Sequence, residues 1–257
     1  MKQSKTDQKG SRNIFLSLAI VVSVTVGALL GWVLSDALDD DDDSLGPDEP
    51  YLPVIDPSKF TNIVDNEFFP LTPGTKTIYE ATTDNGLEHT EVTALNETKV
   101  VMGVTCIVVR DTVSVEGVVT EDTYDWYAQD DEGNVWYMGE DTKEYDNGEV
   151  VSTAGSWEAG IDGAMPGIVM LANPQVGLSY RQEHYKGEAE DMAQVVSLNG
   201  SAVVQYGSFQ NLLMTSEWSP LDPGLVEHKC YAKGIGVVLE LTVKGGSERV
   251  ELVQVIH

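Results

Sequence analysis

The sequence predicts a mainly β fold: an antiparallel meander that forms a curved sheet, half barrel or barrel and follows one N-terminal transmembrane helix. Three observations predict it. Residues 14–34 form one uncharged apolar run, residues 35–60 are acidic and rich in proline, and residues 61–257 alternate apolar with polar side chains between turn dipeptides. We therefore divide the chain into a basic cytoplasmic tail (1–13), a transmembrane helix, a stalk and an extracytoplasmic β domain.

The run IFLSLAIVVSVTVGALLGWVL, residues 14–34, is long enough to cross a bilayer as a helix. The tail before it carries four basic residues and one acidic residue, so the positive-inside rule keeps the N-terminus in the cytoplasm. A cleaved signal peptide is the alternative, although Ser35-Asp36-Ala37 is a poor cleavage site. We expect a single-pass protein of the cell membrane whose C-terminal domain is extracytoplasmic.

Gly27 and Gly31 have the small-xxx-small spacing that lets two membrane helices approach closely. This spacing predicts a homodimer through residues 14–34. Glycine is common in membrane spans, so an ordinary lipid-facing helix is the alternative reading.

The stalk contains five consecutive aspartates, residues 39–43, and four prolines, which together oppose regular helix. Without the tail, 11 basic and 41 acidic residues remain, a net charge of −30. That charge excludes nucleic acid and anionic lipid surfaces as electrostatic partners. It fits a saline habitat, and it fits equally a surface that only keeps the domain soluble.

Strand patterns repeat through the remainder of the chain. They are residues 103–116, 118–129, 134–140, 201–206, 225–234, 236–243 and 249–256. The turn dipeptides that separate strands are Glu116-Gly117, Gly133-Asn134, Asn147-Gly148, Asn199-Gly200 and Gly245-Gly246. A meander of about ten or more strands has to curve. We expect its inner face to carry Val104, Val108, Val237, Leu239, Leu241 and Leu252.

The stretch QDDEGNVWYMGED, residues 129–141, spaces oxygen-bearing side chains around Gly133 in the manner of some calcium loops. An EF-hand loop needs a glutamate six residues after its central glycine, and Gly139 occupies that position. Alternating strand patterns flank the polar residues on both sides. We therefore predict a tight turn between two strands here, and no metal site.

Four motifs carry a resemblance to a known family: FPLTPG (69–74), DWYAQDDEGNVWYMGED (125–141), SWEAG (156–160) and YAKGIGVVLE (231–240). Residues 62–255 resemble a family of extracytoplasmic domains of bacteria and archaea that are anchored to membranes or lipids. The chain is more distantly similar to half barrels of the LolA type, in which a curved antiparallel sheet wraps an apolar ligand. The resemblance implies no catalytic residues.

Three classes of function remain open. The first is binding of an apolar small molecule or lipid in the concave sheet; the residues predicted to line that site are Val104, Val108, Trp126, Trp136, Tyr137 and Leu239. The second is a protein- or glycan-interaction module of the cell envelope. The third is an enzyme with an unrecognised carboxylate site. Catalytic motifs, metal-ligand spacings and cofactor motifs are missing from the sequence, so we expect no enzyme and no cofactor.

Two pairs of residues suggest covalent modification. Cys106 and Cys230 are the two cysteines, and an extracytoplasmic location permits a disulfide between them; two buried free thiols are the alternative. Asn96 and Asn199 each begin a glycosylation sequon, and both lie where a turn is expected. About one or two such triplets arise by chance in a chain of this composition, so the sequons are a weak signal.

Overall fold

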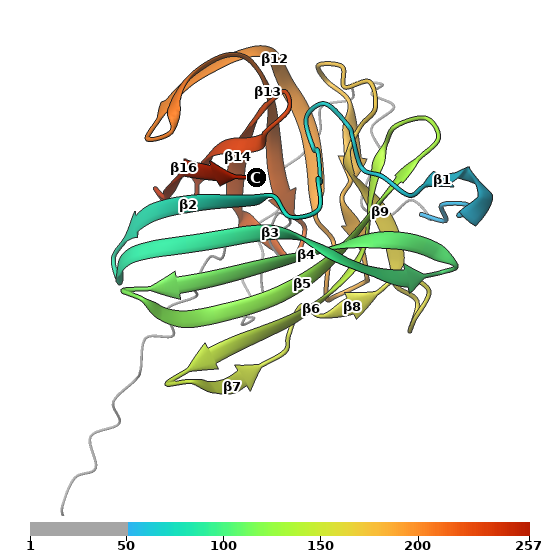
Figure 1. The fold of residues 1–257 in the computed structure, drawn as a ribbon, viewed down its shortest axis with the longest axis horizontal. Coiled ribbons are helices and arrows are strands. Elements are labelled where there is room, and N and C mark those ends of the chain that lie inside the picture. The colour runs from blue at the N-terminus through green and yellow to red at the C-terminus, as the bar shows by residue number, and fades with distance from the viewer. Residues whose placement is uncertain (1–50) are drawn as a thin grey trace, which may run out of the picture.

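A computed structural model describes residues 51–257 (Figure 1). The predicted cytoplasmic tail, the transmembrane helix with Gly27 and Gly31, and residues 35–50 of the stalk lie outside the described residues. Among residues 51–257 no helix is long and apolar enough to cross a membrane. The helical structure of this part is a short 3-10 helix, η1 (Pro57–Lys59).

Sixteen strands form one antiparallel sheet, which confirms the predicted mainly β class. They are β1 (Phe60–Thr61), β2 (Lys76–Thr83), β3 (Gly86–Val101), β4 (Val104–Val115), β5 (Val118–Asp130), β6 (Val135–Asp146), β7 (Glu149–Ser152), β8 (Trp157–Glu158), β9 (Met165–Met170), β10 (Ser179–Arg181), β11 (Glu183–His184), β12 (Met192–Val204), β13 (Gly207–Ser219), β14 (Asp222–Ala232), β15 (Gly236–Lys244) and β16 (Arg249–Ile256).

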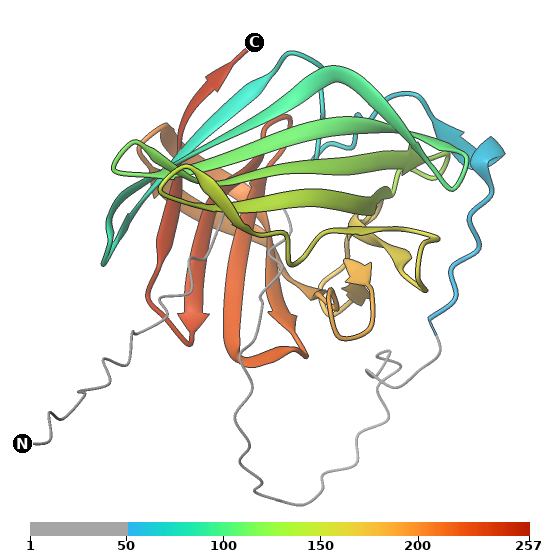
Figure 2. The same cartoon turned by 90° about the horizontal axis from the view of Figure 1, so that it is seen from below.

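Most neighbours in the sheet are also neighbours in sequence, as expected for a meander. The order is β10-β12-β13-β14-β15-β16-β2-β3-β4-β5-β6-β9-β11, with β1 beside β5 and with β7 and β8 beside β6. In Figure 2 the layer of β2 to β6 crosses over the layer of β12 to β16. The sheet is thus strongly curved, as sheets of this size have to be.

Residues 179–184 bring the two ends of this sheet together. Their first half, β10, pairs with β12, and their second half, β11, pairs with β9. The backbones approach closely here, since a Cβ atom on Gly167 of β9 would collide with the carbonyl group of Gln182. The result is a nearly closed, barrel-shaped sheet. We call residues 179–184 and the facing part of β9 the seam.

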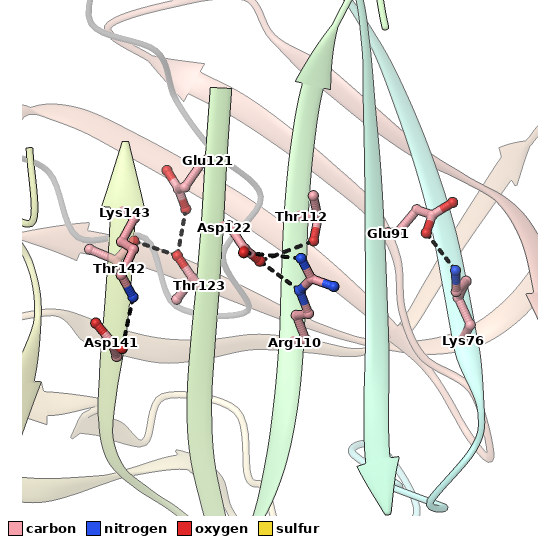
Figure 3. A network of polar contacts seen from close by, with 10 residues as sticks. All are labelled: Lys76, Glu91, Arg110, Thr112, Glu121, Asp122, Thr123, Asp141, Thr142 and Lys143. Carbon is pink, nitrogen blue, oxygen red and sulfur yellow. Dashed lines mark hydrogen bonds and ion pairs between the residues drawn. The ribbon is translucent and has the colours of Figure 1, made fainter. Parts of the chain in front are cut away.

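Ion pairs identify the outer face of β2 to β6 (Figure 3). Arg110 Nε donates to Asp122 Oδ1 over 2.7 Å, from β4 to β5, and Lys143 pairs with Asp141 on β6. Lys76 and Glu91 form a further pair between β2 and β3. All of these side chains are partly exposed. Because side chains alternate along a strand, Val109 and Asp111 on either side of Arg110 point into the barrel.

The register corrects the predicted inner face. Val108 lies opposite Trp126 and shares its face with Arg110, so it is on the outer side of the sheet; by the same alternation Val104, Leu239 and Leu241 are also outside. Leu252 faces inward beside Tyr79, and Val237 lines the interior pocket described below. Alternation shows which residues share a face of the sheet, but it does not show which face is the interior. Val108 is buried although it lies on the outer face, so its burial does not indicate that it points into the barrel.

Four of the five predicted turns are confirmed. The dipeptides at 116–117, 133–134, 147–148 and 245–246 connect consecutive strands, and Glu116 and Asn147 adopt the positive φ that tight hairpin turns require. The prediction for Asn199-Gly200 is wrong. These two residues lie within β12, where the register with β13 shifts and the strand bulges.

The stretch 129–141 is the turn between β5 and β6, as predicted. The carboxylate of Asp130 organises it: Oδ1 accepts hydrogen bonds from the backbone N–H groups of Glu132 and Asn134, and Oδ2 accepts from the side chains of Asn134 and Trp136. These four donors satisfy the carboxylate within the turn.

Residues 51–60, predicted as the end of the stalk, contact the sheet. The Tyr51 hydroxyl donates to the carbonyl oxygen of Pro166 over 3.0 Å, and Tyr51 packs against His184 with ring centroids 5.5 Å apart. Phe60 of β1 pairs with Asp130. The last ten residues of the predicted stalk therefore pack against the β domain at both Tyr51 and Phe60.

Candidate functional site

The interior of the barrel has an apolar part and an acidic part. The apolar part contains a small pocket between the inner faces of β2, β3 and β4, the segment 69–75 and the start of β15. We call it the apolar pocket, and its lining residues are Phe69, Pro70, Leu71, Thr72, Thr75, Thr77, Tyr79, Val92, Ala94, Val109, Ile235, Gly236 and Val237. Thr72 is exposed, so the pocket opens to solvent on this side.

The motif FPLTPG, residues 69–74, builds one wall of this pocket. Leu71 N–H bonds to the Val64 carbonyl over 2.9 Å, which turns Phe69 and Leu71 inward. Gly74, at φ +93°, donates its N–H to the Ala94 carbonyl over 2.7 Å and so returns the chain to β3. Across the pocket the Tyr79 hydroxyl donates to the Val237 carbonyl over 3.1 Å. The wall is thus held by backbone hydrogen bonds.

The volume of the apolar pocket limits what it can hold. It measures about 50 Å³. A cavity of roughly 150 Å³ in another protein binds one benzene molecule. The apolar pocket therefore accepts a small apolar group and has no room for a whole lipid chain.

The six residues predicted to line a ligand site do not come together around this pocket. Tyr137 faces the barrel interior, where its ring stacks on Tyr127. The others, Val104, Val108, Trp126, Trp136 and Leu239, lie on the outer side of the sheet by register. Trp126 is covered there by Lys99, whose ammonium group lies 3.2 Å from the ring centroid.

The acidic part of the interior was not predicted. Nine carboxyl groups, each at most 8% exposed, lie inside the barrel or at its seam. We call them the acidic cluster: Glu88, Asp111, Asp125, Glu140, Glu183, Asp191, Glu217, Glu227 and Glu240. Burying so many acids is costly unless they are paired or protonated.

One end of the acidic cluster surrounds Lys229, which is 1% exposed. Its ammonium nitrogen lies 3.0 Å from Glu217 Oε2 and 3.7 Å from Glu240 Oε2. Glu217 also accepts hydrogen bonds from the hydroxyls of Thr215 (2.7 Å) and Tyr231 (3.0 Å). Burial alone lowers the pKa of Lys229, but the surrounding glutamates outweigh it and raise that pKa above its ordinary value. Lys229 is therefore a charged group at the centre of this end.

At the other end, the carboxyl groups form no ion pair with a cation of residues 51–257. Asp125 and Glu140 are directly opposite each other on β5 and β6, and Asp125 accepts a hydrogen bond from the Tyr137 hydroxyl over 2.7 Å. Trp157 donates its indole N–H to Glu183 Oε2 over 3.1 Å. One oxygen of each carboxyl group, Asp125 Oδ2, Glu140 Oε1 and Glu183 Oε1, is buried without a hydrogen-bond partner in the structure. Buried acceptors without donors indicate bound protons or water.

The acidic cluster predicts how stability depends on pH. Burial raises the pKa of Glu88 and Asp191 to about 8 and that of Asp125 to about 7. In the unfolded chain these groups titrate near pH 4. Folded protein thus holds protons that unfolded protein has released, and this stabilisation is complete below about pH 4 and lost as pH rises through about 8. For each of these three groups we expect the free energy of unfolding to fall by on the order of 3 kcal/mol between about pH 5 and about pH 8.

Denaturant titrations at a series of pH values measure this slope. Asp125→Asn is expected to flatten it, because it removes one interior titrating group. Asp122→Asn is the matched control, because Asp122 lies on the same strand but on the outer face, paired with Arg110. Stability that rises between about pH 5 and about pH 8 would contradict protonated interior carboxyl groups.

The residues predicted for covalent modification are all in the described part. Cys106 and Cys230 are free buried thiols, and burial raises their pKa values to about 12 and about 11. Strands β15, β16, β2 and β3 separate their strands in the sheet, so this arrangement does not support the predicted disulfide. Asn96 and Asn199 are exposed, but they lie at bulges within β3 and β12 and not at turns.

Residues 51–257 contain no group of three or more His, Cys, Asp or Glu side chains placed to hold a metal ion. The acidic cluster is accordingly spread along the barrel and does not converge on one point.

No profile of a known protein family matches the chain, and no curated protein matches it. Two crystal structures are similar to it. One is provisionally described as an exported protein with a YmcC-like fold from Bacteroides fragilis NCTC 9343, with 15% identity, 74% of this chain and 99% of that chain covered, and a TM-score of 0.41. The other is provisionally described as a lipoprotein from Parabacteroides distasonis ATCC 8503, with 10% identity, 76% and 100% covered, and a TM-score of 0.41.

Proposed function

We propose that this chain is a membrane-tethered, extracytoplasmic recognition domain whose apolar pocket receives one small apolar group of a ligand or partner. The observation that carries the proposal is the pocket itself: buried apolar side chains meet at an opening rimmed by Thr72 and Thr75. Such a site is apolar within and polar at its mouth, as small-ligand sites usually are. The tether is the apolar run 14–34, with the domain held outside the membrane by the acidic stalk.

A short alkyl end or the edge of a ring fits the pocket volume of about 50 Å³, and a lipid carrier would need several times more space. Burial of apolar surface would supply the binding free energy, at about 25 cal/mol per Å². The hydroxyls of Thr72, Thr75 and Thr77 lie where the polar remainder of the ligand would leave the pocket. We thus favour partial insertion of a ligand over enclosure of a whole molecule.

Catalysis is the less supported alternative. The carboxyl groups that could act as acid and base are buried, and Asp125 and Glu183 are 0% exposed. The second pocket, beside Asp191, Glu217 and Lys229, measures about 20 Å³, which is room for little more than one water molecule. A pocket of this size has no room for a substrate beside these groups, so we propose a binding role without catalysis.

A homologous series of short primary alcohols tests the apolar pocket. We expect saturable changes in the methyl NMR resonances of Val92, Val109 and Val237, because these side chains line it. Affinity should rise with each added methylene by about 0.8 kcal/mol and stop rising when the pocket is full. Equal shifts at Val113, which is buried on the same face of β4 but does not line the pocket, would indicate a non-specific effect and contradict the proposal.

Ala94→Leu provides the decisive variant. Ala94 lines the pocket and is 5% exposed, so a larger side chain there is expected to occupy the space and abolish the saturable shifts. Val118→Leu is the matched control, because Val118 is exposed beside the β4–β5 turn and does not line the pocket. Unchanged binding by Ala94→Leu would overturn the assignment of the pocket and leave an envelope interaction module as the better account.

A further inference from the structure

The seam is the weakest closure of the barrel. Strand β11 joins β9 through only two residue pairs, Glu183 with Pro166 and His184 with Met165. Proline has no N–H group, so Pro166 offers the seam no backbone donor. On the other side Gln182 N–H bonds to the Asp191 carbonyl over 2.8 Å, whereas Glu183 N–H lies at 3.5 Å from the same oxygen. Few backbone hydrogen bonds thus hold residues 182–184 in place.

Buried acids lie directly behind this weak closure. Glu183 is 0% exposed, and its side chain is held by the Trp157 indole N–H on β8. The side-chain nitrogen of Gln182 is buried without a hydrogen-bond partner in the structure, as is one oxygen of Glu183. Trp157 and the Asp191 backbone donate to the Glu183 carboxyl group, but Oε1 has no partner, and burial still raises the pKa of this group well above its ordinary value.

The groups that interact electrostatically with Glu183 come from several elements. They are Asp191 before β12, Asp125 on β5, Glu140 on β6, and the phenols Tyr127 and Tyr137. The two nearby cations are engaged elsewhere. Lys229 pairs with Glu217 and Glu240, and Arg181 lies over the Tyr51 ring at 5.7 Å and donates to Met192 Sδ. His184 is partly buried, and burial lowers its pKa below the ordinary value of histidine, which favours the neutral ring.

We propose that the seam is a proton-controlled latch, in which protons on Glu183, Glu140 and Asp125 keep the barrel closed and their loss opens it between β9 and β11. With protons bound, the three carboxyl groups carry no charge and do not repel one another. Once the protons leave, the three buried carboxylates repel one another. The two residue pairs between β9 and β11 then have to hold the seam closed against this repulsion. The well-paired strands β3 to β6 resist this repulsion, so the movement is confined to residues 182–184.

Hydrogen exchange of the Gln182, Glu183 and His184 amides, corrected for the intrinsic pH dependence of exchange, tests the latch. We expect their protection to fall about tenfold between about pH 6 and about pH 9 in the wild-type domain. Glu183→Gln should make this fall markedly smaller than in the wild type, because its amide carries no charge, still accepts from Trp157 and still donates as a protonated carboxyl group does.

Glu158→Gln is the matched control. Glu158 neighbours Trp157 on β8, but its carboxylate is partly exposed and pairs with Lys99 over 2.7 Å, so this variant should keep the wild-type pH dependence. Should Glu183→Gln fail to fold, Glu140→Gln on the well-paired strand β6 makes the same prediction. A pH dependence in both Gln variants equal to that of the wild type would overturn the latch, as would protection in the wild type that does not change with pH.

Discussion

Replacing Lys229 with methionine is expected to destabilise the domain by about 3 to 5 kcal/mol at about pH 8. Methionine has a similar length but no charge, so Glu217, Glu227 and Glu240 would remain buried without their cation. The loss should be smaller at about pH 5, because the orphaned glutamates can then take up protons. Denaturant titrations at the two pH values measure both effects.

A compensating variant separates charge from packing. Adding Glu217→Gln and Glu240→Gln to Lys229→Met removes the two carboxylates that contact the ammonium group. We expect this triple variant to recover much of the lost stability, because buried ion pairs are often replaceable by neutral groups of similar size. A loss below about 1 kcal/mol in Lys229→Met would mean that the lysine is not the charge that holds this end of the acidic cluster.

Gly167→Ala is the second substitution with a large expected effect. A Cβ atom at this position would collide with backbone atoms of Gln182, and backbone atoms of the seam cannot move aside as a flexible side chain can. We expect a destabilisation of about 3 kcal/mol or more, or a seam that no longer closes. The free energy of unfolding and the hydrogen exchange of residues 182–184 distinguish these two results.

Gly207→Ala serves as the control for the same substitution. No heavy atom lies within 4 Å of a Cβ atom built on Gly207, and its φ is not in the left-handed region. It should change stability by well under 1 kcal/mol, or raise it slightly through the unfolded state. If both variants lost the same amount of stability, the close approach of the backbones at Gly167 would not contribute to the free energy of unfolding.

The sequence predicted much of the sheet but not its closure. Long strands such as β4 and β5 follow the alternation of apolar and polar residues, and Asn147-Gly148 between β6 and β7 carries its own turn signal. The seam lacks both signals. Strands β10 and β11 are three and two residues long, so they have no period to recognise. Their pairing depends on contacts far apart in the sequence.

The acidic cluster was missed for a different reason. Along β5 the residues Asp125, Tyr127 and Gln129 alternate with Trp126 and Ala128, and aspartate in such a pattern usually marks the solvent side. Here the aspartate set faces inward, while Trp126 is covered on the outside. Tyr127 was the available signal, since a large aromatic residue between two polar ones indicates that the polar set shares a buried face.

The FPLTPG motif predicted the turn that forms one wall of the apolar pocket, but it did not predict the pocket. FPLTPG contains the residues that make a turn before a strand, and the structure places this turn against Ala94. Its proline and glycine predicted the turn, but the partner strand that completes the pocket could not be derived from local sequence. The inner residues Val92 and Val109 gave no distinct signal, because they belong to ordinary alternating strands.

The central claim is that the closed barrel depends on protonated carboxyl groups in its interior. Infrared spectroscopy measures this most directly, because the carbonyl stretch of a protonated carboxyl group is separate from the bands of a carboxylate. We predict a protonated-carboxyl band at neutral pH that weakens in Asp125→Asn and Glu140→Gln, and that weakens in the wild type as pH rises through about 8, where Glu88 and Asp191 lose their protons. A wild-type domain that is folded at neutral pH and lacks this band would contradict the account.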